Sequence, residues 1–465
     1  MITTVSRQYF LAVVQLTVAT LAFSGAAGAQ EKPIQNPSTG EIYERPSQGP
    51  EGSPPVTGPA PSRAIVATKP AQDSGKPFEL GTFLLYPEFV ANWMYDSNVY
   101  YTKEAISDHA MIYSPAAWLQ SNWSRHALNL YAAADLTRYS RYTTENTQDW
   151  RLSAEGRFDI DADTNVYGGL RRSQDHQDRE SPDANNGVTP TPYTQEKAYG
   201  GFYRHFDRVS LRLAGTWQHL DYEDVEFVPG SGGAIRLINN DDRDRRQYTG
   251  GVRLGYELSP TLEPYILAAT DDRRYDNTPD DTGYVRNSDG RRYVVGLRYA
   301  MPKTLKLDVF AGHLSQDYDD SQLKDVSAPV FGGSLLWVAT QKLRMTLNMD
   351  RTVEETTLTQ TVSDGPPLVL IPASSYTNTY SSVGANYSLD DKLSLHGNLS
   401  YSQSKYNGLD RDDAYYGGGV GVEYRVARNF NLDVNWAYRN LHSSNPGENF
   451  IKRQVFIGLV FPMSH

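Results

Sequence analysis

From about residue 81 to the C-terminus, apolar and polar side chains alternate in segments of about ten residues. In the segment 430–438, large apolar side chains stand at every second position, with asparagine, aspartate or alanine between them. Segments 209–217, 305–309 and 343–350 repeat the pattern. A period of two places successive side chains on opposite faces of a β-strand, whereas a helix would distribute them around its axis. The chain is therefore predicted to be all-β.

The breaks between these segments are alternately short and long. Residues 206–209 and 389–392 are short breaks, whereas 177–193, 222–244 and 276–290 are long and polar. An even number of strands, with short turns at one end and long loops at the other, is typical of a transmembrane antiparallel β-barrel of the bacterial outer membrane. The pattern predicts eighteen strands, at residues 83–95, 110–122, 126–139, 147–159, 165–176, 194–206, 209–221, 245–257, 262–275, 291–300, 305–318, 328–339, 343–356, 375–389, 393–405, 412–424, 430–441 and 449–461.

The polar composition agrees with a barrel once the two faces are separated. Hydrophobic residues make up 39% of the chain and the mean hydropathy is -0.56. No apolar run of about 20 residues follows position 30, so no helical span is predicted there. In a barrel only alternate residues contact lipid, and tyrosine, of which there are 32, suits the interfacial girdles. A soluble β-sandwich array or a propeller is the alternative, but neither explains the alternation of short and long breaks.

The N-terminal region divides into two further segments. Residues 1–29 contain one arginine, an apolar stretch and an Ala27-Gly-Ala29 site, which predicts a cleaved signal peptide; an uncleaved anchor helix is the alternative. Residues 30–80 are rich in proline, which is incompatible with a helix interior or a strand ladder. We expect them to form a disordered periplasmic linker that precedes a barrel at 81–465.

The last strand and the first four carry a family resemblance. Val455, Ile457, Leu459 and Phe461 alternate near the C-terminus, as in the closing strand of many outer-membrane barrels. The stretches Phe83–Phe89, Tyr95–Tyr100 and Ser121–Leu128, followed by Arg141–Trp150, resemble the putative beta-barrel porin 2 family. The resemblance implies an outer-membrane barrel, and some members of that family are associated with exopolysaccharide production or export. It implies no catalytic residues.

Motifs for chemistry are scarce. The chain has no Cys and contains no phosphate-binding loop, dinucleotide fingerprint, zinc-protease motif or nucleophile elbow. We therefore expect no enzyme activity, no cofactor and no metal, although a barrel lipid hydrolase assembled between strands stays an alternative. Four aspartate clusters, beginning at Asp241, Asp280, Asp317 and Asp410, are interpreted as solvated loop or strand-end acids, with calcium or bridged lipopolysaccharide as the alternative.

The lumen face is where a function can be predicted. Charged side chains that face the lumen can brace the wall as ion pairs, or they can steer charged solutes through an aqueous channel. Both interpretations stay open. The insertions 222–244 and 357–374 are candidates to fold inward and narrow the channel. Strand parity turns a set of charged residues inward and predicts them as pore-lining: Arg157, Arg212, Arg253, Arg298, Arg344, Arg439, Asp135, Asp308, Asp350 and Asp433.

The sequence thus predicts a porin-like channel of the cell outer membrane, for saccharide or exopolysaccharide. A structural or surface-interaction barrel with a plugged lumen is the main alternative. Expected partners are outer-membrane lipid and lipopolysaccharide, the barrel assembly machinery, and polysaccharide or periplasmic export components; no nucleic acid is expected.

Overall fold

The computed structural model describes residues 77–462, except 182, 186, 229–233, 362–369, 429 and 446. The signal peptide expected at 1–29 lies outside the described residues, as does most of the linker expected at 30–80. Within the described part of the chain, no helix is long and apolar enough to cross a bilayer.

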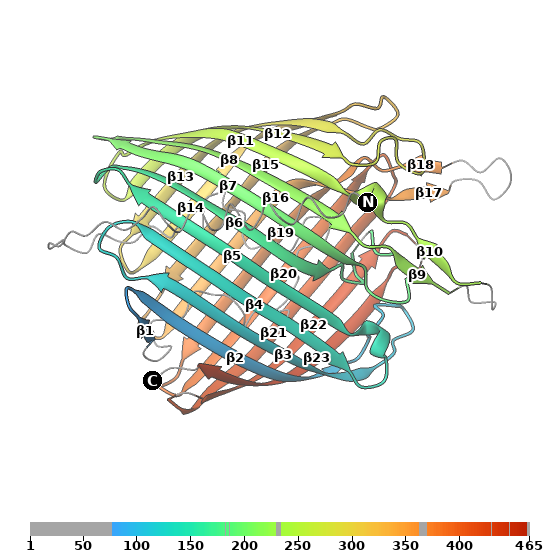
Figure 1. Ribbon diagram of the computed structural model, residues 1–465, viewed down its shortest axis with the longest axis horizontal. Helices are drawn as coiled ribbons and strands as arrows, with labels where there is room; N and C mark the ends of the chain where they lie inside the picture. The colour runs from blue at the N-terminus through green and yellow to red at the C-terminus, as the bar shows by residue number, and fades with distance from the viewer. Residues whose placement is uncertain are drawn as a thin grey trace. The chain divides into compact units, whose positions relative to one another are not determined.

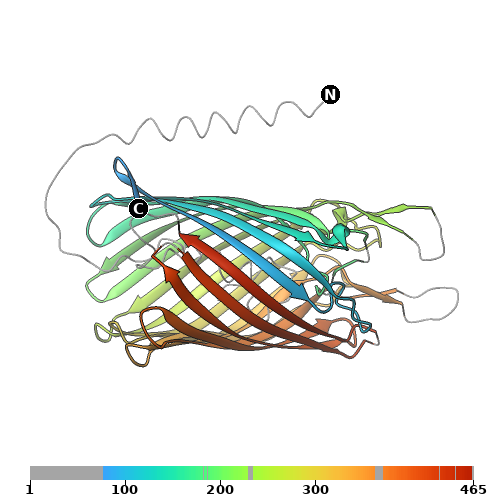
Figure 2. The ribbon, with the colours of Figure 1, turned by 90° about the horizontal axis from the view of Figure 1, so that it is seen from below.

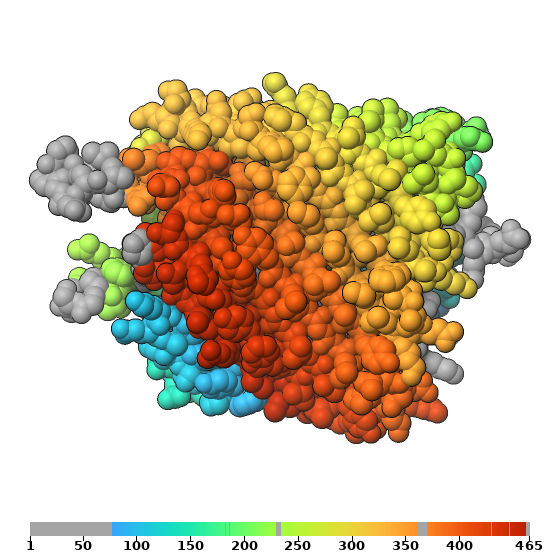
Figure 3. Space-filling view, turned by 180° about the vertical axis from the view of Figure 1, so that it is seen from behind, coloured from blue at the N-terminus to red at the C-terminus, as the bar shows by residue number. Residues whose placement is uncertain are grey.

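Eighteen long antiparallel strands form one closed barrel, which confirms the predicted fold class and strand number (Figure 1). Each strand pairs with its neighbours in the chain, and β2 (Phe83–Asp96) pairs with β23 (Phe450–Pro462) to close the sheet. Seen from behind, the later strands form a continuous wall (Figure 3). Closure leaves no strand edge along most of the wall, as a lipid environment requires.

The other barrel strands are close to their predicted positions. They are β3 (Asp108–Ser121), β4 (Ala127–Tyr139), β5 (Thr147–Asp159), β6 (Thr164–His176), β7 (Pro192–Phe206), β8 (Val209–Tyr222), β11 (Arg245–Tyr256), β12 (Leu262–Tyr275), β13 (Ser288–Met301), β14 (Leu305–Tyr318), β15 (Val326–Val338), β16 (Leu343–Glu355), β19 (Ser375–Ser388), β20 (Leu393–Asn407), β21 (Asp412–Ala427) and β22 (Phe430–Ser443). Short elements outside the wall are β1 (Phe78–Leu80), β9 (Val225–Phe227), β10 (Arg236–Ile238), β17 (Thr359–Thr361), β18 (Leu370–Pro372) and the 3-10 turns η1 (Thr143–Glu145) and η2 (Asp241–Arg243).

The two rims of the barrel differ. The first barrel strand begins and the last one ends at the rim that carries the short connections, which we call the turn rim (Figure 2). The long connections lie at the opposite rim, which we call the loop rim. β1 pairs with the start of β2, so strand structure begins three residues before the boundary predicted at 81.

The two faces of each strand differ as the alternation predicts. On β22, Val434 and Trp436 are 40% and 42% exposed on the outer face, where lipid would contact them. Asp433, Asn435 and Arg439 are each only 6% exposed on the lumen face. The wall therefore carries an apolar outer surface and a charged inner one.

The wall is split between β15 and β16 toward the loop rim. These strands share seven register pairs, from Val338 with Arg344 to Gly332 with Asp350. Beyond Gly332, β15 continues to pair only with β14, and β16 continues with β19 as far as Glu355. The end of β16 has thus separated from β15 while it stays paired with β19.

The end of β16 lies on the lumen side of β15. Val353, which simple alternation would turn outward, is 2% exposed and packs in one buried cluster with the lumen-facing Val326, Ala328 and Val330. This cluster is the largest apolar core of the described chain, and it lies inside the barrel rather than within a separate layer.

The insertions predicted to fold inward at 222–244 and 357–374 behave differently from the expectation. Each contains a two-stranded hairpin, β9–β10 and β17–β18, that forms a sheet separate from the barrel wall and extends beyond the loop rim (Figures 1 and 2). The bases of both insertions are buried: Val225 and Asn240 in the first are each 3% exposed, and Ala373 in the second is 0% exposed, next to Thr356 at 2%. The segment that does reach across the mouth is 177–191.

Candidate functional site in the barrel lumen

The strand register places all the side chains predicted as pore-lining on the lumen side of the wall. Register partners on neighbouring strands share a face, and the chain of pairs is continuous around the barrel. Their role in conduction stays a prediction. They are Arg157 and Asp135 on β5 and β4, Arg212 and Arg253 on β8 and β11, Arg298 and Asp308 on β13 and β14, Arg344 and Asp350 on β16, and Asp433 and Arg439 on β22.

Arginines concentrate on one side of the lumen near the turn rim. Arg212 and Arg253 are direct register partners. Arg253 lies 3.3 Å from Glu263 and 4.0 Å above the ring centre of Tyr265, and Arg298 lies 3.4 Å from the Asp308 carboxylate. These contacts brace the wall across β11 to β14, and they hold the guanidinium groups in fixed positions along the lumen.

Acidic side chains mark another part of the wall near the same rim. Glu423 on β21 and Asp433 on β22 are register partners. His396 on β20 lies 4.0 Å from Asp433, and Asn431 donates to Glu423 at 2.8 Å. The lumen therefore has a basic side on β8 to β13 and an acidic side on β20 to β22.

The segment 177–191, between β6 and β7, is docked over the mouth at the loop rim. Its Glu180 is 5% exposed, and the carboxylate lies 2.7 Å from the guanidinium of Arg439 on β22. The hydroxyl of Tyr415 on β21 donates to the Glu180 backbone carbonyl at 3.2 Å. Burial raises the pKa of Glu180, although the charge of Arg439 opposes the rise.

Two further contacts hold the same segment from other directions. Arg179 forms a two-pronged ion pair with Glu145 of η1, at 2.6 and 3.0 Å. Asp183 accepts a hydrogen bond from the Thr356 hydroxyl, which lies just after β16. The segment thus bridges separated parts of the rim. A cavity of about 120 Å³ remains beneath it, lined by residues that include Asp135, His176 and Arg179.

A second buried network fixes the displaced end of β16. Glu355 forms an ion pair with Arg273 on β12 and accepts hydrogen bonds from the hydroxyls of Tyr275 and Tyr318 at 3.0 and 3.1 Å. These partners all face the lumen from β12 and β14. Glu355 therefore ties the end of β16 to the inside of the nearby wall at β12 and β14.

Arg286, in the connection between β12 and β13, fixes the base of the β17–β18 insertion. Its guanidinium lies 2.6 Å from Asp280 and donates to the carbonyls of Thr356 and Ala373, both at 3.0 Å. Burial tends to raise the pKa of Asp280, but hydrogen bonds from Tyr284, Thr282 and Arg286 outweigh it and lower the pKa. Alternation within strands did not identify these loop contacts, because their partners are far apart in the chain.

Asp244 at the loop rim makes the stability of the barrel depend on pH. Burial, aided by the charges of Asp221 and Asp241, raises the pKa of Asp244 from 3.8 to about 7. The folded state therefore binds a proton more readily than the unfolded state, and stability falls as pH rises from about 4 to about 7.

Asp244→Asn removes this buried charge and should therefore stabilise the barrel at pH 8 by about 1–2 kcal/mol, a value reduced because Asp244 is partly exposed. The hydrogen bond at this position is kept, since the amide oxygen can still accept from the Tyr222 backbone N–H. Urea unfolding in detergent micelles at pH 8 and pH 4 measures it, and the gain should vanish at pH 4. Asp391→Asn, in an exposed short turn, is the control. An equal gain at both pH values would contradict the role of Asp244.

Among the described residues, no group of three or more His, Asp or Glu side chains is arranged to hold a metal ion. The aspartate clusters instead accept hydrogen bonds within the rim, as where Asp280 accepts from Thr282 and Tyr284.

Comparison with known proteins gives one family and several distant structures. The family model described as putative beta-barrel porin 2 matches residues 70–462. No curated protein matches the chain.

Three similar solved structures are distant in sequence. The crystal structure of OpdO from Pseudomonas aeruginosa is 13% identical, with 82% of this chain and 97% of that chain covered and a TM-score of 0.43. The copper transporter OprC is 11% identical, with 83% and 81% covered and a TM-score of 0.44. A mutant of the ferric enterobactin receptor of Pseudomonas aeruginosa is 8% identical, with 80% of each chain covered and a TM-score of 0.41. These values are too low to transfer a substrate or a mechanism.

Proposed function

The chain belongs to the putative beta-barrel porin 2 family and is a porin-like outer-membrane β-barrel, and on this premise we propose that its lumen is a passive path for saccharides, including secreted polysaccharide. Outer-membrane barrels have their short turns on the periplasmic side and their long loops on the outside. The turn rim therefore faces the periplasm and the loop rim faces the outside. The proposal includes no catalytic step.

The charged lumen is the observation that carries the proposal. Arg212, Arg253 and Arg298 line one side, and Glu423 and Asp433 line another. A wall that supported only a plugged, structural barrel would gain more from apolar packing than from buried ions, which are costly to desolvate. Facing sets of opposite charge attract hydroxyl-rich and ionic solutes and disfavour apolar ones.

Planar-bilayer recording of the purified barrel tests the proposal. We expect discrete single-channel conductance, transient block by added oligosaccharide, and a reversal potential in a salt gradient that shifts when Arg212 and Arg253 are replaced by glutamine. The control is Arg204→Gln, since Arg204 lies on the outer face of β7. A bilayer that stays sealed at every voltage would exclude the channel.

The plugged barrel is a second candidate, and the docked segment 177–191 favours it. In that case the long acidic loops would serve as a binding surface, with lipopolysaccharide or an export component as partner. The bilayer recording separates the two candidates, because a permanently plugged native barrel does not conduct.

A further inference from the structure

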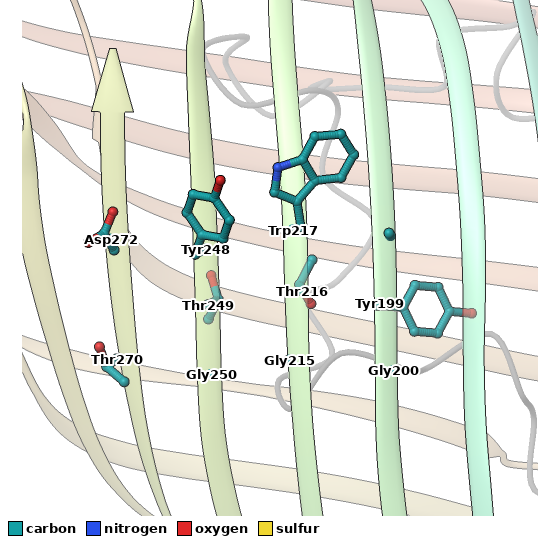
Figure 4. Close-up of a pocket in the computed structure, with 11 residues that line it drawn as sticks. Tyr199, Gly200, Gly215, Thr216, Trp217, Tyr248, Thr249, Gly250, Thr270 and Asp272 are labelled. Atoms are coloured by element: carbon teal, nitrogen blue, oxygen red, sulfur yellow. The ribbon is translucent and has the colours of Figure 1, made fainter. Parts of the chain in front are cut away.

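A recess of about 590 Å³ lies on the outer face of the wall, across β7, β8, β11 and β12. Trp217 and Tyr248 border it. Each lies five residues, an odd number, from the lumen-facing arginine of its own strand, Arg212 or Arg253, so both rings face outward. Figure 4 shows both rings in one row with Asp272, above a row of glycines: Gly250, Gly215 and Gly200.

Glycines form the floor of this recess and extend it across neighbouring strands. A Cβ added to Gly250 would meet no atom within 4 Å, and one added to Gly215 or Gly200 would come no closer than 3.5 or 3.7 Å to another residue. Glycine weakens a strand, so packing within the chain does not account for these positions. We call the row the glycine furrow; its members are successive register partners: Gly156, Gly168, Gly200, Gly215 and Gly250.

Larger side chains border the glycine furrow on both sides. Trp217 and Tyr248 stand on its loop-rim side, and Leu213 and Val252 stand on its turn-rim side. The two borders are four residues apart along each strand, which is about 14 Å. Once the bordering side chains are counted, this width suits a hydrocarbon chain and is too narrow for a helix, which is about 10 Å across.

The glycine furrow is inclined to the membrane plane. Its register row begins at Leu128, the second residue from the turn-rim end of β4, and reaches Ser327, the second residue from the loop-rim end of β15. The tilt of strands in a barrel produces this climb. The glycines therefore lie deeper in the membrane than the part of the row beyond Gly250.

The row becomes polar at its outer end. Thr270 is the register partner of Gly250, and the exposed Arg291 is the partner of Thr270. Ser315 follows as the partner of Arg291. Apolar floor below, with hydroxyl groups and a cation above, is the order of a membrane lipid whose headgroup points outward.

Carboxylates border the polar end on its loop-rim side. Asp272, Asp289 and Asp317 are successive register partners in the next row. Arg274 lies 2.8 Å from Asp272 and 3.1 Å from Asp289, so two of these three charges are paired. The outer end thus offers the Arg291 guanidinium to an anion and carboxylate acceptors to hydroxyl groups. A phosphorylated sugar carries both kinds of group.

From this geometry we propose that the glycine furrow binds one acyl chain of lipopolysaccharide, the phosphorylated glycolipid of the outer leaflet. A headgroup phosphate lies at Arg291, and sugar hydroxyls donate to the carboxylates of Asp289 and Asp317. Within hydrocarbon the chain gains close van der Waals contact with the bare backbone rather than hydrophobic burial. The site is outside the lumen, so it goes beyond the proposed saccharide path and does not depend on it.

Native mass spectrometry of the barrel, extracted from outer membranes in mild detergent, tests the site. The native barrel should retain lipopolysaccharide. Gly250→Leu fills the furrow where a Cβ has room, and it should reduce the fraction of barrels with bound lipopolysaccharide about tenfold. Arg291→Gln should reduce that fraction several-fold. Neither variant should change single-channel conductance, because both positions lie outside the lumen.

Two control variants match these changes. Ala385→Leu adds the same bulk to the outer face of β19. Arg453→Gln removes an outer-face arginine that is the fourth residue from the loop-rim end of β23, as Arg291 is in β13. Neither control should change the retained lipopolysaccharide.

Three outcomes would overturn the site. They are equal lipopolysaccharide retention by the native and Gly250→Leu barrels, phospholipid in place of lipopolysaccharide on the native barrel, and a native dimer that Gly250→Leu converts to a monomer without loss of lipopolysaccharide. The last would assign the furrow to a second copy of the chain. A native barrel that retains the lipid but does not conduct would contradict the saccharide path and leave the site intact.

Discussion

Arg439→Ala should open the mouth of the barrel and raise its single-channel conductance several-fold. The substitution leaves the Glu180 carboxylate buried without the guanidinium 2.7 Å away, and breaking a buried pair in this manner costs about 3–5 kcal/mol. Undocking of 177–191 avoids that cost, because it returns Glu180 to water. Bilayer recording measures the conductance, and limited proteolysis within 177–191 reports undocking independently.

Two variants make this result specific. Arg453→Ala removes an exposed arginine on the outer face of the neighbouring strand and should leave conductance unchanged. Glu180→Leu combined with Arg439→Met replaces the ion pair by an apolar contact and should keep the segment docked. A folded Arg439→Ala barrel with native conductance and native protease resistance would show that Arg439 does not keep the segment 177–191 docked.

Glu355→Leu should release the end of β16 from the inside of the wall. It removes the partner of Arg273 and of two tyrosine hydroxyls, again at a cost of about 3–5 kcal/mol. Hydrogen exchange of peptides covering 350–361 should rise by orders of magnitude. Glu355→Gln keeps an acceptor for the hydroxyls and should give an intermediate increase. Glu104→Gln, in an exposed loop, is the control.

A disulfide trap shows where the released strand goes. If the register of β15 and β16 were extended, Ala328 would lie opposite Glu354. Because the chain has no Cys, the pair Ala328→Cys and Glu354→Cys reports only this contact. It should cross-link in the Glu355→Leu background and stay reduced without that substitution. Equal cross-linking in both backgrounds would contradict a fixed position of β16 inside the lumen.

The alternation of side chains was sufficient to predict the barrel, because each strand displays its own two faces whatever its partners are. It also placed Arg212, Arg298 and Asp433 on the lumen face, since parity is a local property. The same rule fails at Val353. There β16 has separated from β15 while it stays paired with β19, and the face that alternation assigns to lipid packs against the inside of β15.

Contacts across the lumen could not be predicted from one sequence. Glu180 and Arg439 are 259 residues apart, and only the closed barrel brings them together. The packing of Tyr167 and Tyr199 against glycines of the neighbouring strand has a similar origin. The sequence contains Tyr167-Gly-Gly and Tyr199-Gly-Gly, but the register of β6 on β7 decides that each ring covers the other strand's glycine.

The split between β15 and β16 also has a mechanical consequence. Neighbouring interfaces hold twelve register pairs, between β14 and β15, and thirteen, between β16 and β19, whereas this one holds seven. Under a pulling force the barrel would tear first along this short interface. Its seven pairs all lie toward the turn rim. A separation that began at the loop rim would therefore have to break only these pairs before the closed barrel became an open sheet.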